Sequence, residues 1–464
     1  MDDLTILQRL RSNYRAIRAA LPWLDAWQPD DVPPPFPEYN PPAPPAARGL
    51  RRYHPEDGTL EYAAALAAGK APLLVKATQV TFPDLEAVMR ANPHTDFIYC
   101  TGDRKILYDF NTLMLFLQMH PNFYLCAANL CNETPCERIK RRGLLHKLVF
   151  GSMAPFWDED ITMSPIILSN LTWEEKCAVA GNNLRRLLGQ PPVLPPEVPR
   201  DVLPPFFTDA HAHLTRRAEC LPFPILDAEW DWPQWRDLMD YLGTRTMFVT
   251  PNEANRWPEE ASSTIAVPLC EQAGPRLAFF EVFDPRDMEA STRHCEASLP
   301  LESCIGIKIH PAAHRTYASD ARYAEAFRLA AKYDKPIMSH TWEVSSYNPV
   351  QKFSCPHLFE QHLKDFPQVK LVLGHAGGRP STMPEVAYLC SHYPNVSVDL
   401  AGDYFHRGVI QVLARNAGTD RMIFASDINW IDPRCTLGML LQSDLTDNAL
   451  LDILVNNARR VYGK

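Results

Sequence analysis

The 464-residue sequence lacks three features that would assign it to a specialised class of protein. It contains no stretch of 18 or more apolar residues, so no segment is predicted to span a bilayer. Its net charge is -9, which leaves no overall basic surface for nucleic acid. Its first residues, Met-Asp-Asp-Leu-Thr, lack the basic and apolar regions of a signal peptide, and we therefore expect a cytoplasmic protein.

The twelve cysteines lack the spacing of a metal or redox motif. None belongs to a Cys-x-x-Cys pair. Cys126, Cys131 and Cys136 recur at five-residue steps, which match no common zinc pattern. We expect free, buried thiols in a reducing compartment.

Proline is abundant and marks the boundaries between regions of the chain. Residues 29–47 and 191–205 are so rich in proline that neither regular helix nor central strand is expected there. Before the first of these segments, apolar residues at helical spacing predict one amphipathic helix over about residues 3–27. The expected organisation is an N-terminal helix and linker (1–48), a first α/β region (49–190), a Pro-rich linker (191–205) and a second α/β region (206–464).

The second α/β region alternates apolar strands with helical stretches, which is typical of βαβ units. Eight such units within about 260 residues match the size of a complete (β/α)8 TIM barrel. A last helix over 447–462 would close it. The expected strands are 206–213, 244–250, 277–283, 304–310, 336–340, 370–375, 395–400 and 421–427.

Side chains that bind metals stand at the ends of four of these strands. His211 and His213 alternate along the first strand, so both imidazoles project from one face. His340, His375 and Asp427 end the fifth, sixth and eighth strands. In a parallel barrel these ends gather at the C-terminal face, where active sites are built. The sequence therefore predicts a metal site there, because imidazole and carboxylate groups are ligands of zinc.

The first α/β region repeats the pattern of the second half of this barrel. Residues 148–153 match 422–427, and Asn182-Asn183-Leu184-Arg185-Arg186 matches Asn456-Asn457-Ala458-Arg459-Arg460. The ligand positions differ: Lys76 replaces His340, Thr101 replaces His375 and Met153 replaces Asp427.

We interpret this region as a degenerate half-barrel, produced by internal duplication, that keeps the scaffold and lacks the metal. It has no His-x-His strand and no sequence counterpart of the first three barrel strands, so about five strands are expected. The open edges of such a sheet need covering. We expect the N-terminal helix, the barrel or a second subunit to cover them.

Together these motifs resemble the amidohydrolase superfamily, in particular amidohydrolase family 2. That branch contains aminocarboxymuconate-semialdehyde decarboxylase and related TIM-barrel hydrolases and lactonases. The resemblance covers 206–464 in full and 49–190 only as a degraded half, which departs from the usual single barrel. It rests on Asp209-Ala210-His211-Ala212-His213, Gly306-Ile307-Lys308-Ile309-His310-Pro311, Ser339-His340, Gly374-His375-Ala376-Gly377-Gly378, Ser426-Asp427 and Asn457-Ala458-Arg459-Arg460.

The resemblance implies a role for each strand-end residue. His211, His213, His340 and Asp427 would bind one divalent metal, for which we expect zinc. Such a metal lowers the pKa of a bound water to about 7. His375 would be the general base or the electrostatic partner of the water or substrate, and Asp427 would also accept the water proton.

Three further residues are expected near the substrate: Lys308, Arg379 and Trp342. Arg379 would favour an anionic group such as a carboxylate. Lys308 leaves an alternative open, since some members of the superfamily carboxylate a lysine on this strand to bridge two metals. We favour one metal over a binuclear site.

Three functions are compatible with these patterns. The main expectation is a metal-dependent hydrolase that acts on an amide, lactone or ester of a small molecule. The alternative is a metal-dependent non-oxidative decarboxylase, a lyase with the same ligands. The third is a non-catalytic interaction protein, against which the complete ligand set argues. The expected partner is a small-molecule substrate, and the oligomeric state stays open, with a homo-oligomer as one outcome.

Overall fold

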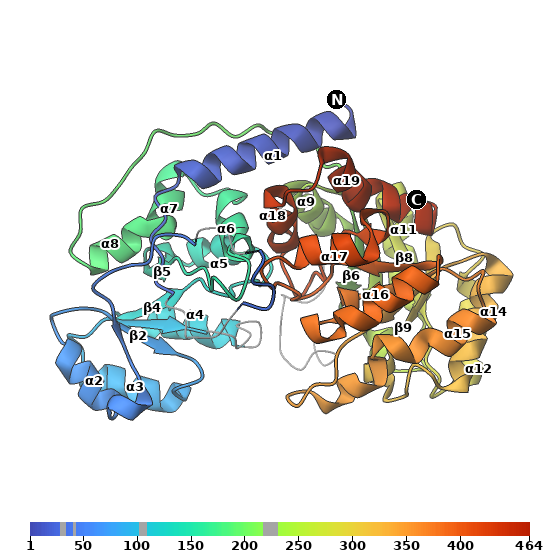
Figure 1. Ribbon diagram of the computed structural model, residues 1–464, viewed down its shortest axis with the longest axis horizontal. Coiled ribbons are helices and arrows are strands. Elements are labelled where there is room, and N and C mark those ends of the chain that lie inside the picture. Colours follow the sequence, from blue (N-terminus) through green and yellow to red (C-terminus); the bar gives the residue numbers. More distant parts are fainter. Residues whose placement is uncertain (28–33, 40–42, 102–108, 217–230) are drawn as a thin grey trace.

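The computed structural model describes residues 1–27, 34–39, 43–101, 109–216 and 231–464. Two parallel sheets organise this part of the chain, one of five strands and one of eight (Figure 1). The expected fold is confirmed: a C-terminal TIM barrel follows a partial parallel sheet. The Pro-rich segment expected over 29–47 lies partly outside the described residues.

The eight barrel strands pair in parallel with their neighbours in chain order. The barrel closes where Ala212 bridges Ile428 and where the Ala210 amide donates to the Phe424 carbonyl (3.1 Å). The strands are buried because helices cover the outside and side chains fill the inside. They are β6 Phe207–Leu214, β7 Thr244–Pro251, β8 Leu277–Val282, β9 Cys304–Ile309, β10 Ile337–His340, β11 Leu371–Gly374, β12 Val396–Asp399 and β13 Met422–Ile423.

The barrel helices begin and end at residues that suit those positions. In α9, Asp231 and Gln234 form a capping box, and Gly243 ends the helix with φ 86°. The expected last helix is present as α19, a π-helical turn and α20. The helices are α9 Trp232–Leu242, α10 Asn252–Arg256, α11 Ser262–Ala273, α12 Met288–Ser298, α13 Pro311–His314, α14 Ala324–Tyr333, α15 Glu360–Asp365, α16 Met383–His392, α17 Val409–Ala417, α18 Pro433–Gln442, α19 Asp447–Leu451 and α20 Asn457–Tyr462.

The N-terminal half carries the five-stranded sheet, in the order β1-β2-β3-β4-β5. Its strands are β1 Arg51–Arg52, β2 Leu73–Lys76, β3 Phe97–Cys100, β4 Phe123–Cys126 and β5 Leu148–Val149. Its helices are α1 Asp3–Ala20, α2 Leu60–Ala67, α3 Phe82–Ala91, α4 Phe110–Met119, α5 Pro135–Arg141, α6 Asp160–Ile167, α7 Trp173–Cys177 and α8 Asn183–Leu187.

Helix α1 lies across both halves of the molecule (Figure 1). Arg11 pairs with Asp447 of the barrel (2.6 Å), and Arg18 pairs with Asp160 of α6 (2.8 Å). The expected extent of this helix, to about residue 27, is wrong. It ends at Ala20 because Leu21 precedes a proline and adopts an extended conformation, with ψ 141°.

Residues 24–27 form an extended segment beside β5 instead of more helix. The Ala26 amide donates to the Phe150 carbonyl (3.0 Å). The Asp25 carboxylate accepts from the amides of Ser152 (3.0 Å) and Trp27 (2.8 Å). This buried aspartate therefore ties the segment to the end of β5.

The barrel repeats these bonds between its first and last strands. Asp209 accepts from the amides of Ser426 (3.0 Å) and His211 (3.4 Å). Asp25 therefore bonds to the end of β5 as Asp209 bonds to the residues after β13, although the sequence offers no reason to expect a counterpart of the first barrel strand here. Only two residues match, Asp25-Ala26 and Asp209-Ala210. The internal duplication itself stays a prediction.

The two halves meet along chain segments that are remote in sequence. Trp157 and His406 form an antiparallel bridge, and buried Glu159 pairs with Arg407 (3.0 Å).

The cysteines that the structure describes are all buried and free, as expected. Within the described residues, no helix combines the length and the apolar character needed to cross a bilayer.

Candidate metal centre

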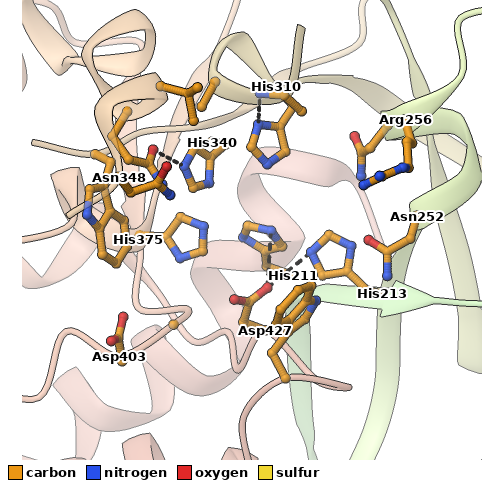
Figure 2. Close-up of a pocket in the computed structure, with 18 of the residues that line it drawn as sticks. His211, His213, Asn252, Arg256, His310, His340, Asn348, His375, Asp403 and Asp427 are labelled. Atoms are coloured by element: carbon orange, nitrogen blue, oxygen red, sulfur yellow. Dashed lines mark hydrogen bonds and ion pairs between the residues drawn. The ribbon is translucent and has the colours of Figure 1, made fainter. Parts of the chain in front are cut away.

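The predicted site residues meet at one cavity of about 1270 Å³ at the C-terminal face of the barrel (Figure 2). All of them line it: His211, His213, His340, His375, Asp427, Lys308, Arg379 and Trp342. They come together because they lie on parallel strands or in the loops that follow them, and the carboxyl ends of these strands meet at one face.

Three of these residues form the tightest cluster. His211, His375 and Asp427 each offer one ligand atom within 4.8 Å of the other two. His213 lies beside them, with Nε2 3.0 Å from Asp427 Oδ1. His375, expected to act as a base, is therefore within the group that could hold a metal ion.

Three imidazoles are held by their Nδ1 atoms. His211 Nδ1 lies 2.9 Å from Asp399 Oδ2, His375 Nδ1 lies 3.2 Å from the Ala401 carbonyl, and His213 Nδ1 lies 3.3 Å from the Thr250 carbonyl. A ring that donates from Nδ1 keeps its Nε2 lone pair for a ligand bond. Carboxylate and carbonyl partners of this kind orient metal-binding histidines.

His340 uses its ring in the opposite sense. Its Nε2 lies 2.9 Å from Gln351 Oε1, so donation there leaves the lone pair on Nδ1. The ring stacks on His310, with centroids 4.1 Å apart, and lies nearly parallel to Trp342. Four imidazoles and one carboxylate thus have the chemistry of a divalent-metal site.

Sequence reasoning missed Asp399, which is fully buried at the end of β12. Besides His211, it accepts the backbone amide of His375 (2.8 Å), so it orients two members of the cluster. A signal was present: an acidic residue ends the seventh barrel strand, as Asp427 follows the eighth.

A family profile described as Amidohydrolase matches residues 208–464, more than half of the chain. The chain belongs to the amidohydrolase family. No curated protein matches the chain at the threshold applied.

Several solved structures are similar to the chain at low identity, and each match covers little more than half of the chain. 2,6-Dihydroxybenzoate decarboxylase from Rhizobium is 16% identical, with a TM-score of 0.42, and the match covers 55% of this chain and 98% of that one. 5-Carboxyvanillate decarboxylase from Novosphingobium aromaticivorans, complexed with manganese, is 14% identical with a TM-score of 0.44. That match covers 56% of this chain and 96% of the decarboxylase. Amidohydrolase 2 from Bifidobacterium longum subsp. infantis is 16% identical with a TM-score of 0.40, and the match covers 55% of this chain and 98% of that one.

Burial and neighbouring charges shift the pKa values of Asp427 and Lys308 in the site. Burial raises the pKa of Asp427, but the nearby histidines, His213 first among them, outweigh it and lower the pKa to about 2. Burial lowers the pKa of Lys308 to about 8. Lys308 Nζ lies 2.9 Å from His211 Nε2 at the base of the site. One metal stays the prediction, with a binuclear site at Lys308 as its alternative.

Tight turns hold the cluster in place. His375 and Asp427 both have positive φ angles, 61° and 70°, which residues other than glycine rarely adopt. Gly402 packs under His375, and a Cβ atom there would lie 2.5 Å from His375 Nδ1. The loop after β12 must therefore carry glycine at this position.

Arg379, from the loop after β11, also lines the cavity. Its guanidinium pairs with Asp403 (3.1 Å) and lies 4.7 Å over the Trp342 ring and 6.0 Å over that of Trp157. Trp157 comes from the N-terminal half, as does Thr78, which lines the cavity. Sequence reasoning missed both, because nothing local indicates that the first half borders the site.

Proposed function

We propose that the protein is a metal-dependent decarboxylase of small aromatic acids, the alternative to the hydrolase that the sequence first favours. One observation carries this proposal: the cluster of His211, His375 and Asp427 lines a cavity whose other walls are aromatic rings and cations. The aromatic side chains are Trp257, Trp342, Tyr347 and Trp430, and the cations include Arg379. A planar ring fits between such walls, and a guanidinium attracts a carboxylate.

The metal would be held by His211, His213, His340 and Asp427, the set expected from the sequence, with zinc or manganese as the candidates. When bound, a divalent cation draws electrons from the oxygens of a substrate. The nearly parallel rings of His340 and Trp342 form one wall for an aromatic acid. Arg379, fixed by Asp403, orients its negative end.

Decarboxylation breaks the bond between the ring carbon and the carboxylate, and CO2 leaves. The electron pair stays on the ring carbon, which must take up a proton. The proton donor in this proposal is His375 in its doubly protonated form, which gives up the Nε2 proton and keeps its Nδ1 bond to the Ala401 carbonyl. The hydrolytic alternative would use the same cluster to activate water, which the mixed histidine and carboxylate ligands also permit.

The two reactions are separated by their products. A panel of hydroxylated benzoates labelled in the carboxyl group should release labelled CO2 in the presence of zinc or manganese, with no new carboxylic acid. A matched panel of aryl esters, lactones and amides should be inert. Acid release from the second panel without CO2 from the first would refute decarboxylation and restore the hydrolase expectation.

A further inference from the structure

The N-terminal half is bonded to a barrel loop that carries part of the metal site. The segment between β5 and α6 runs antiparallel to the loop after β12. The Asp158 amide donates to the Phe405 carbonyl (2.9 Å), and the Arg407 amide donates to the Phe156 carbonyl (3.2 Å). These two backbone bonds fix the segment against the loop, as in a pair of antiparallel strands.

Trp157 lies between these two hydrogen bonds, and its ring is next to two barrel side chains. The ring centroids of Trp157 and His406 are 4.6 Å apart, and the Arg379 guanidinium lies 6.0 Å over the Trp157 ring. Burial and the nearby Arg379 lower the pKa of His406 to about 3, so this imidazole is neutral at pH 7. Of the two neighbours, Arg379 therefore carries the charge. A guanidinium over the face of an indole ring is attracted by the π electrons.

Arg379 also has contacts within the barrel. Its guanidinium lies 4.7 Å over the Trp342 ring and pairs with Asp403 (3.1 Å). Asp403 lies on the same side of the site as His375 (Figure 2). Arg379, Trp342 and Asp403 all line the metal cavity, whereas Trp157 is 5% exposed and is not part of the described lining. An effect of Trp157 on a ligand must therefore pass through Arg379.

We propose that Trp157 is a positioning residue of the active site, which holds the Arg379 guanidinium in the orientation that binds the substrate carboxylate. This inference rests on the proposed function, in which Arg379 orients the negative end of an aromatic acid. Without the indole ring, the guanidinium keeps Asp403 and Trp342 but has more rotamers available, and ordering it weakens carboxylate binding. The N-terminal half thus serves the reaction although it supplies no ligand of the proposed metal set.

Calorimetric binding to the metal-loaded full-length protein tests this without catalysis. The probes are benzoate and benzamide, which have nearly the same size but differ in charge, so a change in their affinity ratio reports on Arg379. Trp157→Leu should lower the preference for benzoate about 3-fold or more and change benzamide affinity little. Trp157→Phe keeps an aromatic face and should retain more of the preference than Trp157→Leu. Equal losses in the two variants would overturn the role of the ring.

A matched control accounts for the stability lost when a buried tryptophan is replaced. Trp173 of α7 is a buried tryptophan of the same half. Trp173→Leu should lower the melting temperature but leave the benzoate preference unchanged. If Trp157→Leu does not fold, Trp157→Phe decides the question, and an unchanged preference in that variant overturns the inference.

A double-mutant cycle separates positioning from a general change in the cavity. Arg379→Gln should lower the benzoate preference ~10-fold or more, because it removes a charge-assisted hydrogen bond to the carboxylate. Adding a Trp157 variant to Arg379→Gln should lower the preference no further, since no guanidinium is left to position. Losses that add in the double variant would overturn the inference.

The outcomes distinguish this inference from the function on which it rests. A benzoate preference that falls in Arg379→Gln but persists in both Trp157 variants overturns the positioning role and leaves the proposed function standing. Failure of benzoate to bind the metal-loaded wild type overturns the proposed function itself, and the inference with it.

Discussion

His340 and His375 stand side by side at the cluster, with ring centroids 4.7 Å apart, but their rings are held differently. His375 is fixed through Nδ1 on a backbone carbonyl, and His340 through Nε2 on Gln351. Both nitrogens left over can bind a cation. Either residue could therefore bind the metal, and the proposed mechanism makes His340 the ligand and His375 the proton donor.

Alanine variants of these two histidines should behave differently. His340→Ala should lose most of the bound metal, because it removes a ligand of the proposed set. His375→Ala should keep most of the metal and lose about 10²–10⁴-fold in kcat, because it removes the proton donor. The measurements are metal per chain by mass spectrometry and kcat on an aromatic acid. Equal metal loss in both variants would contradict the role given to His375.

At the scale of elements, the loop after β12 fixes the positions of His375 and Arg379. Gly402 has φ 81°, and its Cα faces His375. The same loop bears Asp403, which holds Arg379, and Arg407, which pairs with the N-terminal half. Its geometry therefore links the proton donor to the substrate-binding arginine.

Gly402→Ala should lower kcat about 10-fold or more without loss of metal, since the added methyl displaces His375 from its bond to Ala401. Gly418→Ala is a matched control, because Gly418 also has a positive φ, 89°, but a Cβ atom there would meet only the side chain of Asp420. Both variants should lose about 1–2 kcal/mol of stability in urea unfolding. Equal kcat values for the two variants would refute the positioning role of Gly402.

The barrel and the ligand positions were predictable from sequence for a physical reason. Side chains alternate along a strand and parallel strands end at one face, so His211, His213 and Asp427 had to converge. The end of α1 was also predictable, since Pro22 follows Leu21. The approach of Trp157 to Arg379 was not, because it depends on how the N-terminal half packs against the barrel, which no local pattern encodes.

On the scale of the whole molecule, buried ion pairs hold the N-terminal half against the barrel. Arg434 of α18 pairs with Glu137 of α5 (2.8 Å), and both are buried. Within the N-terminal half, Lys76 Nζ lies 4.7 Å over the ring of Trp27, at positions that match His340 and His211. This lysine places a fixed cation where the barrel would bind a metal, which fits the predicted duplication.

Glu137→Gln should destabilise the protein by about 3 kcal/mol, because it leaves a buried guanidinium with less counter-charge. Burial raises the pKa of Glu137, but Arg434 outweighs it and lowers the pKa to about 2. The wild type therefore has this contribution in full above pH ~4.3, the unfolded value, and loses it as the pH falls toward 2. Urea unfolding from pH 7 to 3 measures both.

The exposed pair Lys332–Glu296 provides the control for that experiment. Glu296→Gln should leave stability nearly unchanged, because water and salt screen an exposed ion pair. If the two variants lose the same stability, or if the Glu137 variant keeps the pH dependence of the wild type, the Arg434–Glu137 pair does not hold the halves together.

The central claim is that the barrel of this chain binds a catalytic divalent metal and the N-terminal half does not. The most direct test is metal analysis of the purified full-length protein after expression with zinc or manganese. We predict about one equivalent per chain, lost in His211→Ala together with activity. Less than ~0.2 equivalents in the wild type would contradict the account.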